Sequence, residues 1–497
     1  MSVLVRQVLS TCSTGRIWGA ACTNFSFSTP FAQLTPQTFL SARLLSHVRP
    51  VLSEIARMQN IPHQLLPRDM YLDRLKACQD NGLVKVVTGI HGCGKSSLLA
   101  LMREHLLASG IAREQILSID FKSAHTRSLT PADCCNLVQG HVLPGRRLYL
   151  FLDEPQQYMR GWEEGVRSIG TNPDCDIFIA ASETGQLSSG SCDCLAGRSV
   201  EIRMLPLSFR EFLRFHGFTV GESRPSRPGT DRHSVFNRDG EALSLEEAFC
   251  LYLRYGGMPG LVGTGLDPDR AWIRLDEICC AVMVHALSGY GRCPGEGLIR
   301  DPELLEHIML CLAGTVGTPM SLRSICRTLA AESTVKARGR GRRGTPATQT
   351  VAAYVRALLH GCLFHEVRRL DLKSGTELRT LGTYYMVDMG LRNFLLGYRD
   401  TDTGHLLENV VFLELLRRGY AVKTGKIGKR TIDFIATRDR ETICCQVTLD
   451  MDDREQALAP LRAVRDNCEK LVLSLRTLST APVDGIRIVP LLDFLLQ

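Results

Sequence analysis

The chain has 497 residues, of which 44% are hydrophobic and 22% charged, and its formal net charge is +7. This length predicts about three domains, and the composition is typical of a globular protein rather than of a disordered or fibrous one. No apolar run reaches the length of about 20 residues that a membrane-spanning helix needs, so we expect no transmembrane segment.

Residues 1–57 form a predicted N-terminal extension. This segment carries several arginines, many serines and threonines, and no acidic residue before Glu54. Its composition resembles that of a mitochondrial transit peptide. The alternative is a disordered extension or a start codon chosen too early, which we prefer because Met58 lies just before the globular patterning begins. The 19 cysteines form no C-x-x-C pair, which indicates a reducing compartment. We therefore expect a cytoplasmic protein, with a mitochondrial location as the alternative.

Residues 58–218 predict an α/β domain. Short apolar runs alternate here with helical patterns, and this alternation is typical of a parallel sheet with helices on both faces. The predicted strands are residues 84–88, 116–120, 148–153, 176–182 and 200–205.

A phosphate-binding loop follows the first of these strands. Residues 89–96 fit the pattern G-x-x-x-x-G-K-[ST] of a P-loop, whose glycines let consecutive backbone N–H groups turn toward phosphates. Lys95 is placed to reach the β- and γ-phosphates of ATP, and the Ser96 hydroxyl to ligate Mg²⁺. The alternative is a plain glycine-rich turn. The predicted ATP-binding residues are Gly89, Gly92, Cys93, Gly94, Lys95, Ser96, Ser97 and Ser182.

Hydrolysis requires further groups, and three candidates follow the P-loop. The strand at 148–153 ends in Asp153-Glu154, the Walker B form, in which Asp153 holds Mg²⁺ and Glu154 acts as general base toward water. The next strand ends at Ser182, a candidate sensor of the γ-phosphate. Arg198 is a candidate for stabilising the transition-state charge, within its own chain or in a neighbouring subunit. The alternatives are ordinary strand ends and surface residues.

The middle of the chain predicts two segments after a linker at residues 219–244. Residues 245–315 are helical, and residues 316–400 show the order helix, basic loop, helix and β-ribbon. This order is that of a winged helix, in which a helix enters the major groove of DNA and the basic loop at 336–344 contacts the backbone. The alternatives are a solvated loop and a plain helical module.

Several stretches resemble prokaryotic AAA-type ATPases whose P-loop module is followed by a domain of unknown function. The resemblance extends from Met58 to the C-terminus and implies an ATPase core, a winged-helix segment and a nuclease-like C-terminal fold. Two departures stand out: Ala181-Ser182-Glu183 replaces the usual Gly-Ser-Asn, and His285-Ala286 replaces a Lys-Asp pair. The matching stretches are residues 81–89, 152–156, 205–212, 252–259, 384–392 and 407–420.

Residues 401–497 match the order of a restriction-endonuclease-like core. Glu408, Asp433 and Gln446 stand where such a core holds its metal-binding side chains. The position of the lysine that activates water is occupied by Thr448, so we expect a domain without nuclease activity.

These features predict an ATPase that requires ATP and Mg²⁺ and couples its nucleotide state to a C-terminal region that binds nucleic acid or a protein partner. One alternative is a slow nucleotide-gated switch that binds a protein partner. Another is an ATP-regulated nuclease. We expect no membrane partner, and an oligomer would suit a role of Arg198 in a neighbouring subunit.

Overall fold

The computed structural model describes residues 65–123, 126, 128–159, 161–182, 197–222, 233–236, 242–289, 301–336, 346–399, 402–452, 454–465, 467–477 and 479–497. The predicted N-terminal extension, and residues 337–345 with most of the predicted basic loop, lie outside these ranges. None of the helices in the described part of the chain combines the length and the apolar character that a transmembrane span requires.

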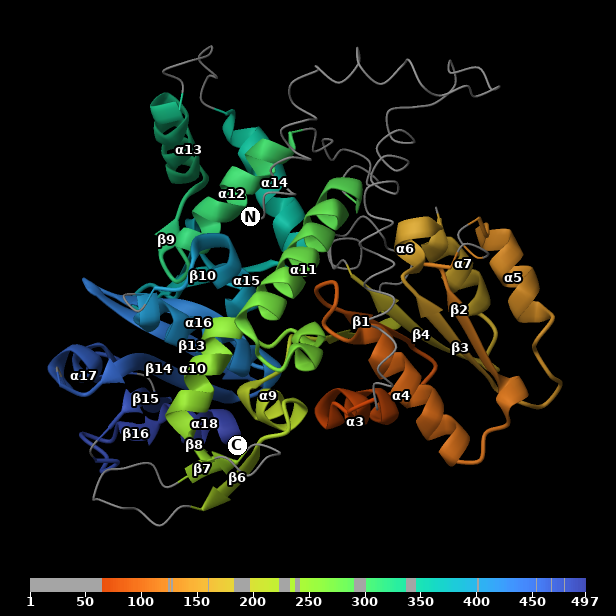
Figure 1. Ribbon diagram of the computed structural model, residues 1–497, viewed down its shortest axis with the longest axis horizontal. Helices are drawn as coiled ribbons and strands as arrows, with labels where there is room; N and C mark the ends of the chain where they lie inside the picture. Colours follow the sequence, from red (N-terminus) through yellow and green to blue (C-terminus); the bar gives the residue numbers. More distant parts are fainter. Residues whose placement is uncertain are drawn as a thin grey trace. The chain divides into compact units, whose positions relative to one another are not determined.

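A parallel five-stranded sheet forms the core of the first domain (Figure 1). Its strand order is β2-β3-β4-β1-β5, so β4 lies between the strand that precedes the P-loop and the strand that ends in Asp153. The first three predicted strands have the predicted bounds, and the other two begin one residue earlier. The strands are β1 (Val84–Thr88), β2 (Ile116–Asp120), β3 (Leu148–Asp153), β4 (Cys175–Ala181) and β5 (Ser199–Arg203).

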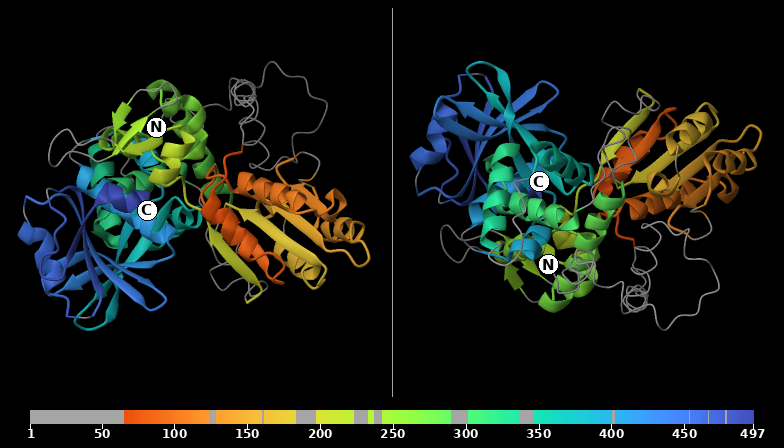
Figure 2. Two further views of the ribbon diagram at one scale, coloured as in Figure 1. Left: turned by 90° about the horizontal axis from the view of Figure 1, so that it is seen from below. Right: turned by 90° about the horizontal axis from the view of Figure 1, so that it is seen from above.

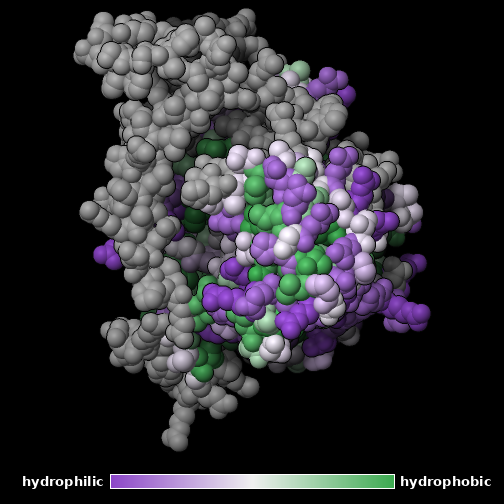
Figure 3. Space-filling model, turned by 90° about the vertical axis from the view of Figure 1, so that its right-hand side faces the viewer, coloured by the Kyte–Doolittle hydropathy of each residue, from purple (hydrophilic) through white to green (hydrophobic). Residues whose placement is uncertain are grey.

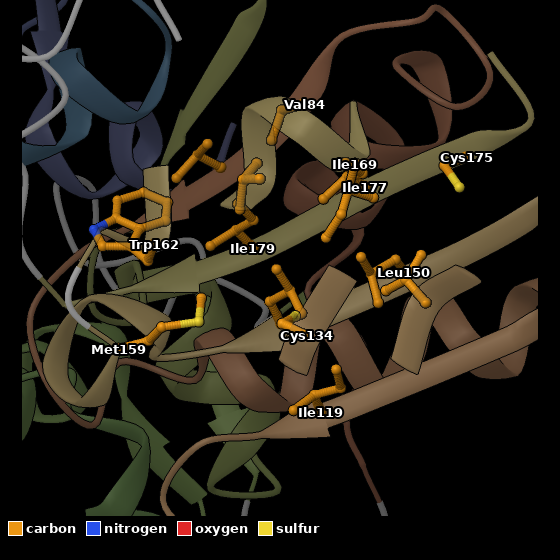
Figure 4. Packing of buried hydrophobic residues seen from close by; sticks show 14 of the residues in the cluster. Val84, Ile119, Cys134, Leu150, Met159, Trp162, Ile169, Cys175, Ile177 and Ile179 are labelled. Atoms are coloured by element: carbon orange, nitrogen blue, oxygen red, sulfur yellow. The ribbon is translucent and has the colours of Figure 1, made fainter. Parts of the chain in front are cut away.

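Helices cover both faces of this sheet, as Figures 1 and 2 show. Because side chains alternate along a strand, Leu150 and Leu152 of β3 point to one face, where they join a buried cluster with Trp162 (Figure 4). Phe151 points to the opposite face and stacks on Phe178 of β4 with ring centroids 4.9 Å apart. The α/β prediction for this domain is therefore confirmed. The helices here are α3 (Asp69–Ala77), α4 (Lys95–Ala108), η3 (Arg113–Gln115), α5 (Pro131–Gln139), α6 (Pro155–Tyr158), α7 (Trp162–Ile169) and α9 (Phe209–Phe215).

The outer surface of the described chain carries only scattered large apolar side chains. Figure 3 shows one face, on which hydrophobic and hydrophilic residues are interspersed. Leu137 and Leu143, for example, expose 36% and 37% of their surface. Such single apolar residues are normal on a protein surface and do not by themselves indicate a partner.

The segment predicted to be a linker contains a small antiparallel sheet, which corrects that prediction. Its strands are β6 (Thr219–Glu222), β7 (His233–Phe236) and β8 (Ala242–Ser244), paired in the order β6-β7-β8. The proline-rich part that suggested a linker falls in residues 223–232, which lie outside the described residues. Thr219 and Val220 of β6 pair with Phe236 and Val235 of β7.

Helices occupy most of the described chain between this sheet and residue 360. Ser244 caps the first of them through a capping box with Glu247, in which each side chain accepts a hydrogen bond from the other residue's backbone N–H. The elements are α10 (Leu245–Tyr255), η4 (Pro259–Thr264), α11 (Pro268–Gly289), α12 (Pro302–Gly314), α13 (Leu322–Lys336) and α14 (Thr348–His360).

A mixed eight-stranded sheet forms the C-terminal part of the chain. Its order is β16-β15-β14-β13-β12-β10-β11-β9, so the hairpin β10–β11 and the strands after residue 420 belong to one sheet. The link is a parallel pairing of Arg369, Leu370 and Asp371 with residues of β12. The strands are β9 (Pro319–Met320), β10 (Phe364–Asp371), β11 (Thr376–Met386), β12 (Ala421–Ile427), β13 (Arg430–Arg438), β14 (Glu441–Asp450), β15 (Glu469–Arg476) and β16 (Arg487–Pro490). The helices are α15 (Met389–Leu396), α16 (Thr403–Arg417), α17 (Arg454–Arg462) and α18 (Leu491–Leu496).

Candidate functional site

The loop between β1 and α4 has a backbone that only glycines adopt without strain. Gly89, Gly92 and Gly94 have φ angles of 151°, 82° and 102°. A Cβ atom on Gly89 would lie 2.2 Å from the carbonyl oxygen of Met204, which leaves no room for a side chain. Helix α4 begins at Lys95, so its N-terminal N–H groups face the loop, as anion binding requires.

The Lys95 ammonium lies folded into the loop. It donates to the carbonyl oxygens of Gly89 at 3.0 Å and Ile90 at 3.1 Å, and to Oγ of Ser182 at 3.0 Å. Burial lowers the pKa of Lys95, but nearby negative charge, including the Glu154 carboxylate, outweighs it and raises the pKa above its ordinary value. Burial also raises the pKa of the Cys93 thiol, so at neutral pH we assign the negative charge to Glu154 rather than to Cys93. Lys95 is therefore a cation in this site.

Glu154 is held in the same buried cluster. It has a left-handed backbone with φ of 59° and is only 1% exposed. Its carboxylate lies 3.6 Å from the Lys95 ammonium and accepts hydrogen bonds from the Ser182 backbone N–H at 3.0 Å and from the Ser182 hydroxyl. Gln156, which the sequence analysis did not single out, donates to the same carboxylate at 2.5 Å. The insertion of β4 beside β3 thus brings Ser182 and Glu154 together.

Asp153 and Ser96 lie on the exposed side of this cluster. Oδ1 of Asp153 is buried and, within the described part of the chain, accepts no hydrogen bond. Oδ2 lies 3.3 Å from the ammonium of Lys122, which also donates to Oγ of Ser96 at 3.1 Å. A carboxylate oxygen without a donor next to a hydroxyl at a helix N-terminus suits Mg²⁺, which prefers oxygen ligands. Ser96 and Ser97 both have exposed side chains in the first turn of α4.

Arg68 binds the backbone of the P-loop, and the sequence analysis did not identify it. Its guanidinium donates to the carbonyl oxygens of Cys93 at 3.2 Å and Leu205 at 2.7 Å, and pairs with Glu211 at 2.7 Å. Burial lowers the pKa of Arg68, yet the Glu211 carboxylate more than compensates and raises it. A single arginine before a helix has no recognisable pattern, so only the fold identifies this contact.

Arg198 is not brought to the site. Its carbonyl oxygen accepts from the N–H of Val84 at the start of β1, whereas the P-loop follows the other end of that strand. Five strand residues separate the two ends by about 16 Å, more than an arginine side chain spans. The predicted role of Arg198 toward a phosphate in its own chain is therefore contradicted by the structure.

A loop from the middle of the chain touches the P-loop. A Cβ atom on Gly92 would lie 3.5 Å from Cε of Met258, and one on Gly94 3.9 Å from Cγ of Pro259. The preceding residue, Gly257, donates its N–H to the carboxylate of Asp388 at 2.6 Å. Asp388 is fully buried, and burial raises its pKa to about 6.

Asp388 connects this loop to the C-terminal part of the chain. It follows the last strand of the β10–β11 hairpin and caps α15, because its carboxylate also accepts from the N–H of Leu391 at 3.1 Å. A continuous set of contacts therefore joins the P-loop, residues 256–259, Asp388 and the hairpin.

A second cluster of polar residues lies between α16, β13 and β14. Asp433 accepts hydrogen bonds from Nε2 of Gln446 at 3.0 Å and from the N–H of Val447 at 2.8 Å. Burial raises the pKa of Asp433 to about 7, and burial together with the charge of Asp433 raises that of Glu408 to about 8. The structure thus brings together Glu408, Asp433 and Gln446.

Thr448 of β14 stands at the position of the water-activating lysine that the sequence analysis considered. Thr448 donates its hydroxyl to the carbonyl oxygen of Asp450 at 2.7 Å. Across the described ranges, no three His, Cys, Asp or Glu side chains gather into a metal-binding group.

Two family models match separate parts of the chain. A family model described as an AAA domain matches residues 81–213, and one described as a domain of unknown function matches residues 246–402. An uncharacterized protein of Haemophilus influenzae is 29% identical over 434 residues, which cover 87% of this chain and 99% of that protein. An uncharacterized protein of Methanocaldococcus jannaschii is 24% identical over 340 residues, covering 68% of this chain and 67% of that protein.

Among solved structures, the Walker-type ATPase of Pyrococcus abyssi is similar with a TM-score of 0.43 and 16% identity. The match covers 66% of this chain and 95% of the Pyrococcus abyssi chain. The family match, the parallel sheet and the P-loop geometry agree on one assignment. Residues 81–213 form an AAA-type P-loop domain, and a domain of unknown function follows it over residues 246–402.

Proposed function

We propose that this protein binds and hydrolyses ATP with Mg²⁺, and that its nucleotide state controls the C-terminal half. The observation that carries the proposal is the buried cluster of Glu154, Lys95 and Ser182 beside the P-loop. A general base next to the position of the γ-phosphate is the group that turnover requires beyond nucleotide binding.

In the proposed reaction, the N–H groups of the P-loop and of the first turn of α4 hold the phosphates. Lys95 leaves the carbonyl oxygens of Gly89 and Ile90 and turns toward the β- and γ-phosphates. Asp153 and Ser96 would hold Mg²⁺, which supplies positive charge that neutralises the phosphate oxygens as the bond to the leaving group breaks.

Glu154 must be released before it can act on water. In the arrangement described above, Ser182 and Gln156 occupy its carboxylate oxygens. We infer that Ser182 exchanges this contact for the γ-phosphate, which frees Glu154 to accept a proton from the attacking water. Ser182 would then act as the sensor that makes activation of Glu154 depend on bound ATP.

We propose that the C-terminal half binds DNA through a winged-helix segment. The order α12, β9, α13, α14, β10 and β11, with β9 paired to β11, supports this assignment. In such a segment α14 would be the recognition helix and the hairpin β10–β11 the wing. The positive charges of residues 336–344 would contact the phosphate backbone.

The test is steady-state ATP hydrolysis by the wild type and by Glu154→Gln, with and without double-stranded DNA. We expect DNA to stimulate the wild type, and Glu154→Gln to lose about 10²- to 10⁴-fold in kcat while it still binds ATP. Tight ATP binding with negligible turnover under every condition would instead favour the alternative, a nucleotide-gated switch with a protein partner.

A nuclease is the less favoured alternative, and it has its own test. It requires Mg²⁺-dependent cleavage of DNA that disappears in Asp433→Asn. We expect no cleavage by either protein, because Thr448 stands where such enzymes place a lysine.

For Arg198, the remaining proposal is a contact with the nucleotide of a neighbouring subunit, which requires that the protein oligomerise.

A further inference from the structure

The ammonium of Lys122 lies between two groups that are the proposed ligands of Mg²⁺. It is 3.1 Å from Oγ of Ser96 and 3.3 Å from Oδ2 of Asp153. Ser96 is the second residue of α4, and Asp153 ends β3, so the two ligands come from separate elements. Lys122 follows the neighbouring strand β2, and no P-loop pattern includes it.

The backbone holds Lys122 at this place. Its N–H donates to the carboxylate of Asp120 at 2.9 Å, and the N–H of Phe121 donates to the carbonyl oxygen of Asp153 at 3.1 Å. The backbone of Lys122 therefore lies directly beside the end of β3. Its side chain is 36% exposed, which leaves it room to turn away into solvent.

From this geometry we propose that Lys122 competes with Mg²⁺ for the Ser96–Asp153 site. This inference rests on the proposed function, since it concerns the same nucleotide site. Without Mg²⁺ the ammonium neutralises Asp153 and bonds to the Ser96 hydroxyl. Mg²⁺ must displace it, because an ammonium and a Mg²⁺ ion cannot both occupy the space between the two oxygens. Lys122 thereby sets the Mg²⁺ concentration at which nucleotide binding tightens.

The competition lowers the apparent affinity of the site for Mg²⁺. The fraction of protein with Lys122 turned away limits the apparent affinity for Mg²⁺, just as the competent fraction limits any ligand. Replacing Lys122 by Ala removes the competitor, while Lys95, which also feels the charge of Asp153, stays in place. Arg at this position keeps the charge and should retain the competition.

The test is a titration of the full chain with Mg²⁺ in the presence of a fluorescent, non-hydrolysable ATP analogue. We expect the Mg²⁺ concentration at half-maximal tightening to fall about twofold to fivefold in Lys122→Ala, the range for losing a partly exposed ion pair. Lys122→Arg should stay close to the wild type. The matched control is Arg113→Ala, which removes one exposed positive charge before the opposite end of β2 and should leave the midpoint unchanged.

Three results separate the outcomes. An unchanged or higher Mg²⁺ midpoint in Lys122→Ala, with normal binding by the wild type, would overturn the competition and leave the proposed ATP site standing. A shift of the same size in Arg113→Ala would also overturn it, since the effect would then be one of net charge. Failure of the wild type to bind the analogue at any Mg²⁺ concentration would refute both proposals.

Discussion

The buried ion pair between Arg68 and Glu211 is expected to contribute strongly to the stability of the fold. The two side chains are 4% and 13% exposed, so removing the guanidinium leaves a carboxylate buried without its counter-charge. We expect Arg68→Met to lower the free energy of unfolding by about 3–5 kcal/mol, the usual cost of breaking a buried pair. Urea denaturation measures this change.

An exposed pair provides the matched control for Arg68. The guanidinium of Arg214 lies 2.6 Å from the carboxylate of Asp69, but their side chains are 43% and 61% exposed. Solvent screens such a pair, so Arg214→Met should cost less than about 1 kcal/mol. Similar losses in Arg68→Met and Arg214→Met would show that burial of the Arg68 pair contributes nothing special.

The second cluster predicts a stability that falls as the pH rises. The pKa values of Asp433 and Glu408 are raised to about 7 and 8, against about 4 in an unfolded chain. The folded state therefore binds more protons than the unfolded state between about pH 4 and 8, and stability is lost across that window. Asp433→Asn removes one of the two charges. Its unfolding free energy should fall less between pH 5 and pH 8 than that of the wild type, by about 1–3 kcal/mol.

Chemical denaturation at pH 5 and pH 8, with EDTA present, measures this difference. Asp439→Asn is the control, because Asp439 is exposed in the turn after β13 and has a left-handed backbone that Asn also adopts. If Asp439→Asn and Asp433→Asn change the pH dependence equally, the buried pair is not its source.

At the residue scale, the sequence reveals groups that belong to a known pattern. The P-loop, Asp153 and Glu154 are recognisable because their chemistry fixes both residue type and spacing. Arg68 and Lys122 are not, because their partners lie in elements far apart in the sequence and only the fold brings them together. Arg198 shows the reverse error: it is a plausible residue type at the wrong end of a strand.

Among the elements, the loop at residues 256–259 has little room for added side-chain atoms. A Cβ atom on Gly257 would lie 2.3 Å from the carbonyl oxygen of Leu207, so Gly257→Ala must displace backbone. We expect it to lower the free energy of unfolding by about 1–3 kcal/mol, as overpacking does. Gly314→Ala is the control, since a Cβ atom there meets nothing within 4 Å. Thermal or urea unfolding of both variants decides the matter, and a neutral Gly257→Ala would contradict the close packing.

Element prediction succeeded where the hydrophobic pattern was simple. The strands of the parallel sheet read as short apolar runs, and three of them have the predicted bounds. Strand β12 has no such simple pattern, because Lys423, Gly425 and Lys426 make it look like a polar turn. In the sheet, Gly425 sits at a register shift, where a Cβ atom would lie 2.9 Å from Ile432 and Ile435. Glycine is therefore needed inside that strand, a meaning that composition alone does not reveal.

For the whole molecule, the contacts from the P-loop to Asp388 predict that nucleotide binding is felt in the C-terminal half. Met258 and Pro259 approach the P-loop glycines, and Gly257 is bonded to Asp388. We expect ATP with Mg²⁺ to slow amide hydrogen exchange at residues 256–258 and 387–396 as well as in the P-loop. Lys95→Ala should abolish all of these changes, because it cannot hold the phosphates. Protection confined to the P-loop would show that this path carries no coupling.

The eight-stranded sheet also has a consequence for genetics. Strand β10, in the segment proposed to read DNA, pairs directly with β12, which lies beyond the predicted boundary at residue 400. A premature stop codon shortly after that boundary would remove β12, one of the two strands that β10 pairs with, and expose an unpaired backbone edge that invites aggregation. The truncated product would contain every residue of the proposed DNA-reading segment, but that segment would not fold correctly. A nonsense mutation between residue 400 and the end of β12 should therefore be as damaging as one in the middle of the gene.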